Sequence, residues 1–124
     1  MNEDIKRIFI DTVTTYNYSD KEIDDDILKE LYELTKWGAT SFNCSPLRLV
    51  FLKSEKAKNR IDPYLMDANK VSVKKSQVCV IIAMDTKFFT DLPRNFKAVD
   101  AKVFFENNEE LTHATAFRNS SLQA

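Results

Sequence analysis

The chain has 124 residues, a formal net charge of −1, 44% hydrophobic residues and a single glycine, Gly38. A chain of this length is expected to form one domain over residues 1–124. The lone glycine excludes Gly-rich phosphate loops, which need more than one glycine at close spacing. The N-terminus, residues 2–7, is charged and has no apolar segment, and no apolar run is long enough to span a membrane. These features predict a cytoplasmic protein.

The chain has two cysteines, Cys44 and Cys79, and one histidine, His113. Without a CxxC motif or a second imidazole, no metal site is expected, and the cysteines are expected to be reduced. Cys44 and His113 can be imagined as a nucleophile and its base, but they lie far apart in the sequence. No third group is evident to orient them, so a thiol enzyme is not favoured.

The first half of the chain predicts two helices. Apolar residues recur at helical spacing over residues 5–12, and a polar turn over residues 16–20 follows. Asp24 is positioned to cap a second helix, and Gly38 is expected to end it in the left-handed conformation. The apolar stripe of this helix consists of Ile27, Leu28, Leu31, Leu34 and Trp37.

The middle of the chain predicts two strands joined by helices. Residues 47–52 and 78–84 are expected to be strands, and the second, apolar on both faces, is expected to be covered on both sides. Ser54 caps a helix through about Ile61, and a further helix covers about residues 69–76. Helical material between two strands suggests a βαβ-like unit in an α+β or α/β sheet.

The last third predicts a loop over residues 85–96, a short helix over about 99–106 and a longer helix from about Asn108. Nothing in its sequence ends this helix, and two strands make a marginal sheet. We therefore expect the fold to be incomplete at the C-terminus or to need a partner subunit. Small residues on one face of the last helix would let another helix approach closely: Ala114, Phe117, Ser121 and Ala124.

Positive charge is concentrated in residues 47–75, which carry eight basic and three acidic side chains. This block predicts either a basic surface for a nucleotide phosphate or nucleic acid, or an ordinary solvated face opposite the acidic second helix. The second interpretation is favoured because no aromatic stacking residues alternate with the lysines.

Residues 40–46 place hydroxyls, an amide and a thiol between a helix end and a buried strand. Loops in such positions of α/β sheets often bind ligands. Uncharged donors and acceptors suit the edge of a planar heterocycle better than they suit a metal ion. An ordinary Asn/Ser/Pro turn is the alternative.

The segment Thr40-Ser41-Phe42-Asn43-Cys44-Ser45-Pro46, together with Arg118-Asn119-Ser120-Ser121-Leu122-Gln123, resembles the nitroreductase superfamily, and within it the malonic semialdehyde reductase subgroup. The resemblance extends over residues 28–48 and to residues 68–71. It implies an α+β flavoprotein with a central sheet flanked by helices, which forms a homodimer and binds FMN at the subunit interface. It also implies that family members are longer than this chain.

The same resemblance implies a set of cofactor-binding residues but no catalytic residue. Ser41, Asn43 and Ser45 would lie along the flavin and its ribityl chain, and Asn69 would reach the pyrimidine edge of the ring. The alternative role for Asn69 is to cap the helix that it precedes. Thr14 takes the position of an arginine that usually holds the FMN phosphate, and a threonine offers one hydrogen bond instead of a charged bidentate grip.

Three functions are consistent with these features. The first is an FMN-dependent oxidoreductase that takes electrons from NAD(P)H and reduces a small aldehyde, enone, quinone or nitro compound. The second is a truncated or degenerate relative that dimerises, binds FMN poorly and is not catalytic. The third is a nucleic-acid or partner-binding module that uses the basic block of residues 47–75.

Overall fold

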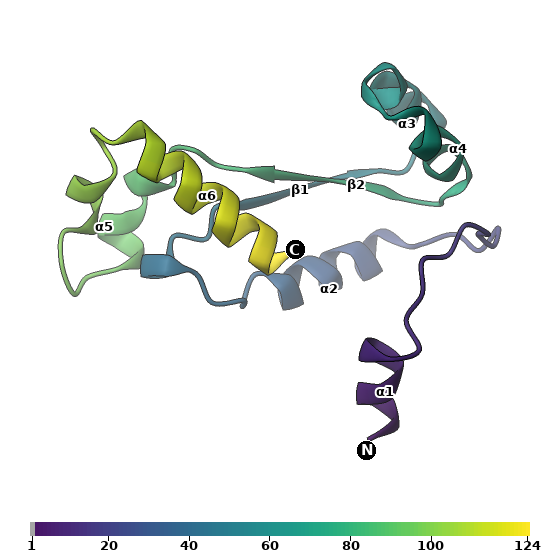
Figure 1. Ribbon diagram of the computed structural model, residues 1–124, viewed down its shortest axis with the longest axis horizontal. Helices are drawn as coiled ribbons and strands as arrows, with labels where there is room; N and C mark the ends of the chain where they lie inside the picture. The colour runs from purple at the N-terminus through teal and green to yellow at the C-terminus, as the bar shows by residue number, and fades with distance from the viewer. Residues whose placement is uncertain (1) are drawn as a thin grey trace.

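The computed structural model describes residues 2–124 as helices around one two-stranded sheet (Figure 1). The α-helices are α1 (Glu3–Phe9), α2 (Asp25–Thr35), α3 (Glu55–Ile61), α4 (Asp67–Lys75), α5 (Leu92–Asn95) and α6 (Glu109–Gln123). The strands are β1 (Leu47–Leu52) and β2 (Cys79–Met84), and the 3₁₀ turns are η1 (Ser41–Asn43), η2 (Asp62–Tyr64), η3 (Phe88–Thr90) and η4 (Ala101–Phe104).

The two strands pair antiparallel, with Leu47 opposite Met84 and Leu52 opposite Cys79. The expected βαβ-like unit is therefore wrong, because that unit joins parallel strands. The reason lies in the connection: α3 and α4 pack against each other and return the chain to the end of the sheet where β1 stops (Figure 1). A parallel pair would need the connection to run back along the whole strand.

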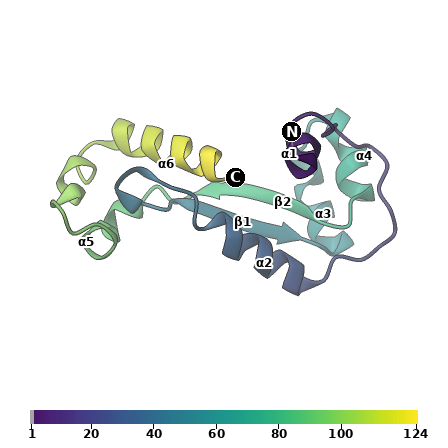
Figure 2. The same cartoon turned by 90° about the horizontal axis from the view of Figure 1, so that it is seen from below.

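The sheet is covered unevenly. The helix α6 contacts both strands, and Figure 2 shows α2 running along β1 while α3 and α4 lie at the far end. Val50, Val80 and Ile82 remain exposed, so the expectation that the second strand is covered on both sides does not hold within this chain. Burial on two faces needs two packed layers, which residues 2–124 do not place around β2.

The hydrophobic core lies at the other end of the molecule, where η1, η3, α5, η4 and α6 meet. Its fully buried members are Cys44, Phe88, Leu92, Ala101, Phe105 and Ala116, with Met84, Phe89 and Phe96 packed against them. The segments expected as a loop over 85–96 and as a helix over 99–106 are in fact short helical turns that supply most of this core. The polar residues 40–46 therefore rest on the best-packed part of the chain.

The helix ends agree only in part with their expected caps. Ser54 Oγ accepts a hydrogen bond from Ala57 N at 3.2 Å, so it caps α3 as expected. Asn108 Oδ1 accepts one from Leu111 N at 3.0 Å and caps α6, although no cap was predicted there. Asp24 occupies the N-cap position of α2 without a side-chain cap bond. Within residues 2–124, no glycine has a positive φ, so the expected left-handed conformation of Gly38 is wrong.

Two apolar helix faces are open. Along α2 only Leu28 is buried, and the rest of the predicted stripe, Ile27, Leu31, Leu34 and Trp37, is exposed. Along α6 the packed face consists of Thr112, Thr115, Ala116, Asn119 and Ser120, while the small-residue face at Ala114, Phe117, Ser121 and Ala124 is exposed. No helix in residues 2–124 is long and apolar enough to cross a membrane.

Candidate functional site

The polar loop, defined here as residues 40–46, has an unusual backbone. Phe42, Asn43 and Ser45 have φ angles of 54°, 52° and 40°. Non-glycine residues rarely adopt this left-handed region, and each such residue costs about 1 kcal/mol or more. The loop can keep this shape only if its surroundings fix it.

Part of the polar loop is buried in the core. The Phe42 ring lies 5.4 Å from that of Phe96 and 5.9 Å from that of Phe105, both in edge-to-face geometry. The Cys44 side chain is 3% exposed and Pro46 is fully buried. These residues anchor the loop through apolar contacts.

The remaining residues of the loop point the other way. Ser41 and Asn43 are exposed, and Ser45 is half-buried. The structure therefore places three of the expected cofactor residues, Ser41, Asn43 and Ser45, in one loop with their side chains at least partly accessible.

Hydrogen bonds fix both ends of the loop backbone. Asn119 Oδ1 accepts from Ser41 N at 2.8 Å, and Asn119 Nδ2 donates to Thr115 O at 2.8 Å inside α6. Thr40 Oγ1 accepts from Ser45 N at 3.0 Å. Asn119 is 5% exposed, and its amide pairs at once with the partly buried Ser41 N–H and with the buried carbonyl of Thr115.

Two further loop amides are also engaged. Asn43 N donates to Thr40 O and Cys44 N donates to Ser41 O, each at 3.0 Å. The backbone N–H groups of residues 41, 43, 44 and 45 are therefore used inside the protein. What these four residues can offer to a ligand is mainly their side chains.

Arg48 ties the loop to the sheet. Its Nη1 donates to Ser45 O at 3.0 Å and to Leu47 O at 2.9 Å, and its Nη2 lies 2.7 Å from Asp85 Oδ2. Asp85 N donates in turn to Pro46 O at 2.8 Å. The sequence alone does not identify Arg48, Asp85 or Asn119 as parts of the site. Knowing that the strands pair antiparallel would have placed Arg48 beside Asp85. No local sequence pattern indicates that Asn119 contacts the loop.

The two remaining expected residues lie elsewhere. Asn69 is exposed in the first turn of α4, which begins at Asp67 after Met66 as N-cap residue, so Asn69 is not the cap. Thr14 is exposed in the segment of residues 12–24, which Gln77 Nε2 holds to the start of β2 by donating to Ser19 O at 3.1 Å. Figure 1 shows α4 and η1 at opposite ends of the sheet.

The separation follows from the length of β1. Six residues at about 3.3 Å each put roughly 20 Å between the polar loop and the far end of the strand. Asn69 thus lies at the α4 end of the sheet, away from the polar loop, and Thr14 lies in the segment whose Ser19 is tied to the start of β2. Neither residue is brought to the polar loop within one chain.

The profile of the Nitroreductase family matches residues 12–119. The chain belongs to the nitroreductase family. A Burkholderia lata relative, provisionally named NADH dehydrogenase/NAD(P)H nitroreductase, is 44% identical over 119 residues, which are 96% of this chain and 61% of the relative. This member of the family thus spans about three fifths of the length of that relative.

Solved structures show the same fold. A Bacillus subtilis nitroreductase, also provisionally named, superposes with a TM-score of 0.80 over 98% of this chain and 66% of its own, at 18% identity. A provisionally named Exiguobacterium sibiricum nitroreductase in complex with FMN gives a TM-score of 0.75 over 87% of this chain and 60% of its own, at 19% identity. The expected α+β nitroreductase-like fold is confirmed.

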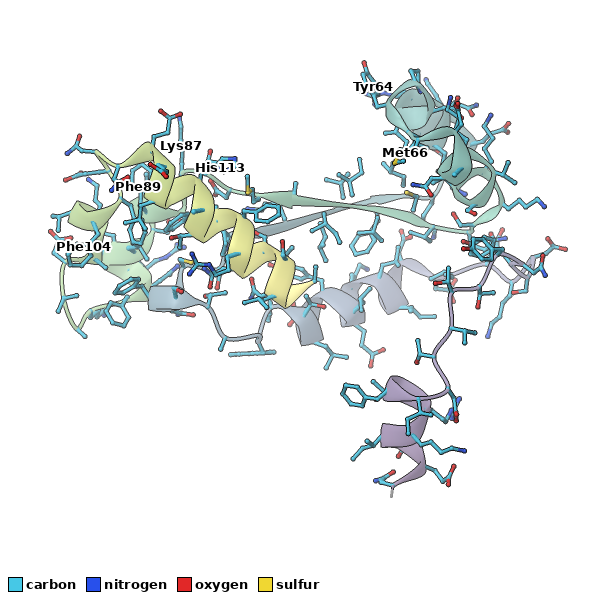
Figure 3. The ribbon with its side chains drawn as sticks, viewed as in Figure 1. Tyr64, Met66, Lys87, Phe89, Phe104 and His113 are labelled. Carbon is cyan, nitrogen blue, oxygen red and sulfur yellow. The ribbon has the colours of Figure 1, made fainter. Side chains whose placement is uncertain are left out.

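In this nitroreductase-family chain, Cys44 and His113 form no catalytic pair. Burial raises the pKa of the Cys44 thiol, and a hydrogen bond with Thr40 only partly opposes this, so the thiol stays neutral. His113 is exposed on α6 and lines a separate cavity of about 420 Å³ with Phe89 and Lys87 (Figure 3). Across residues 2–124, no group of three or more His, Cys, Asp or Glu side chains is placed to hold a metal ion.

The basic block does not form a continuous free surface in this member of the family. Lys58 is buried and donates to Ser76 O. Four more of its basic side chains are paired with carboxylates, in the pairs Arg48–Asp85, Lys53–Asp25, Lys70–Asp67 and Lys74–Asp62. This pairing favours the solvated-face interpretation over a nucleic-acid surface.

Proposed function

We propose that this nitroreductase-family protein is an FMN-dependent oxidoreductase that takes electrons from NAD(P)H and reduces a small aldehyde, enone, quinone or nitro compound. The observation that carries the proposal is the polar loop, whose backbone is fixed by hydrogen bonds to Thr40 and Asn119 and whose Ser41 and Asn43 side chains are exposed, with Ser45 half-buried. The family membership and the names of the relatives support it. With both cysteines free, a cytoplasmic location is part of the proposal.

The donor set of the polar loop fits a flavin. Asn43 Nδ2 donates to Asn95 O at 3.3 Å, which leaves Asn43 Oδ1 to accept from a ligand N–H or hydroxyl. The Ser41 and Ser45 hydroxyls can donate or accept, so the three side chains can line a ring edge of mixed polarity or a ribityl chain. FMN would supply hydride transfer, and the protein would supply orientation and an uncharged polar lining.

Asn69 and Thr14 would serve the other parts of the cofactor. Asn69 would face the pyrimidine edge, and the Thr14 hydroxyl would give the phosphate one neutral hydrogen bond. Figure 3 shows Tyr64 and Met66 beside the start of α4, and these apolar side chains are 87% and 75% exposed. Exposed apolar side chains next to Asn69 suit a surface that a second chain or a ligand covers.

We further propose that the protein acts as a homodimer. A separation of roughly 20 Å along β1 is longer than a three-ring heterocycle, so the polar loop and Asn69 of one chain cannot both hydrogen-bond the same flavin ring. Two copies could place the polar loop of one chain against Thr14 and Asn69 of the other. The flavin site would then depend on association.

The first prediction concerns FMN binding. The purified protein is expected to be yellow or to take up added FMN, measured by visible absorbance, by quenching of FMN fluorescence and by oxidation of NAD(P)H with a quinone or nitro acceptor. Asn43→Leu should weaken FMN binding about tenfold, because it removes an acceptor and leaves a flavin donor unpaired. Thr90→Ala is the control, since Thr90 is exposed on η3 and its hydroxyl donates to Lys87 O at 2.9 Å, outside the polar loop.

A colourless protein that takes up no FMN would contradict this proposal and favour a degenerate relative that dimerises without a working flavin site. Size measurement on the same sample would then show whether it still associates. Salt-sensitive binding to random DNA would instead favour a nucleic-acid module.

A further inference from the structure

We infer that Asn119 of α6 is a positioning residue for the cofactor, because it fixes the backbone of the polar loop through Ser41 N–H. This inference rests on the proposed function, since it concerns the same flavin site. It concerns a residue that has no place among the expected cofactor ligands and that lies 78 positions away from Ser41 in the sequence. Asn119 does not itself reach the accessible side of the loop.

The first step of the argument is the strain in the loop. Phe42, Asn43 and Ser45 all have positive φ angles although none is glycine. Such a conformation persists only where contacts from other elements determine it. Without them, the loop would relax toward ordinary angles, and the exposed side chains of Ser41 and Asn43 would lose their fixed positions.

The second step is the kind of contact that Asn119 makes. Its Oδ1 accepts from the amide that immediately precedes the first left-handed residue, at 2.8 Å, and its Nδ2 is held by Thr115 O, also at 2.8 Å. The amide group is thus fixed at both ends and cannot rotate away from Ser41 without leaving a buried polar group unpaired.

The third step is the rigidity of the helix that carries Asn119. Ala116, one turn earlier, is 0% exposed in the core, and α6 contacts both strands. The α6 helix is therefore rigidly packed, and its hydrogen bond through Asn119 fixes where the loop backbone lies relative to the helix. Because Ser41 N–H already donates to Asn119, Ser41 would hydrogen-bond a flavin through its hydroxyl and not through its backbone amide.

The experiment compares Asn119→Leu with Thr112→Val. Thr112 lies on the same helix and is equally buried, and its single hydroxyl hydrogen is shared between Phe105 O and Asn108 O, away from Ser41. Both variants lose buried hydrogen bonds, so both should lower thermal stability. All measurements are made at a temperature at which each variant is folded by circular dichroism.

Asn119→Leu is expected to speed hydrogen exchange of the Ser41 amide about tenfold and to weaken FMN binding about tenfold, while Thr112→Val leaves both near wild type. Asn119→Asp keeps an oxygen for Ser41 N–H, so it should retain slow exchange at Ser41 even if it is less stable. If Asn119→Leu does not fold, Asn119→Ser, whose side chain is too short to reach Ser41, takes its place.

Slow exchange at Ser41 in Asn119→Leu, or FMN binding equal to that of Thr112→Val, would overturn the inference. A wild-type protein that binds no FMN would instead contradict the proposed function. The exchange rate at Ser41 would still report on the role of Asn119 in the loop, so the two failures are distinguishable.

Discussion

At Gly38 the chain passes close to the end of α6. A Cβ built on this residue would lie 3.2 Å from Cγ of Gln123 and 3.4 Å from the carbonyl oxygen of Thr35, and Gln123 Nε2 donates to Gly38 O at 2.9 Å. The backbone does not need glycine here, because its φ is not positive. The absence of a side chain instead lets two distant segments meet.

This contact makes the effect of Gly38→Ala depend on Gln123. In the wild-type background, the tight contact should offset the gain from a stiffer unfolded chain, which is about 0.4–1 kcal/mol. With Gln123→Ala the obstructing Cγ is gone, so the alanine should then stabilise by roughly that amount. Denaturant unfolding of the four proteins in this cycle measures it. A loss above about 1 kcal/mol in both backgrounds would show that the backbone itself requires glycine.

At the scale of elements, α3 and α2 offer a matched pair of helix starts. Ser54 caps α3 with a hydrogen bond to Ala57 N, whereas Asp24 sits at the start of α2 without one. Ser54→Ala should therefore cost about 1 kcal/mol in the free energy of unfolding, and Asp24→Ala should cost less, since it loses only a favourable charge near the helix N-terminus. Equal losses in urea unfolding would mean that charge, and not the cap bond, stabilises both helices.

The elements that the sequence predicts well are those defined by local patterns. The strand over residues 47–52 and the helix after Ser54 were located correctly, because apolar runs and caps act over a few residues. The relative direction of the two strands was predicted wrongly, because an apolar run has the same pattern whichever way the strand runs. The polar character of the loop at Ser41, Asn43 and Ser45 could be predicted from composition, whereas its bond to Asn119 depends on how α6 packs.

At the scale of the whole molecule, the chain leaves much apolar surface open for its size. The stripe along α2 at Ile27, Leu31, Leu34 and Trp37 faces away from the core, and so does Phe117 on α6. Contiguous apolar faces of this kind mark association surfaces. This open surface and the separation of Asn69 from the polar loop are the observations on which the proposed homodimer rests.

Leu34→Lys should therefore weaken both association and FMN binding. Leu34 is 69% exposed in one chain, and a lysine there would have to bury an unpaired charge in a dimer, which should raise the dimer dissociation constant at least about tenfold. Val103→Lys is the control: Val103 is 52% exposed on η4, outside both apolar helix faces, so the same change should leave association intact.

If the flavin site is shared, FMN binding and dimerisation are linked by mass action. Wild-type affinity for FMN should then rise with protein concentration, and FMN should restore part of the dimer in Leu34→Lys, both measurable by sedimentation with fluorescence detection of flavin. FMN binding by monomeric Leu34→Lys at wild-type affinity would show that one chain suffices. The polar loop and the α4 end would then serve different ligands, and Asn69 and Thr14 would need another explanation.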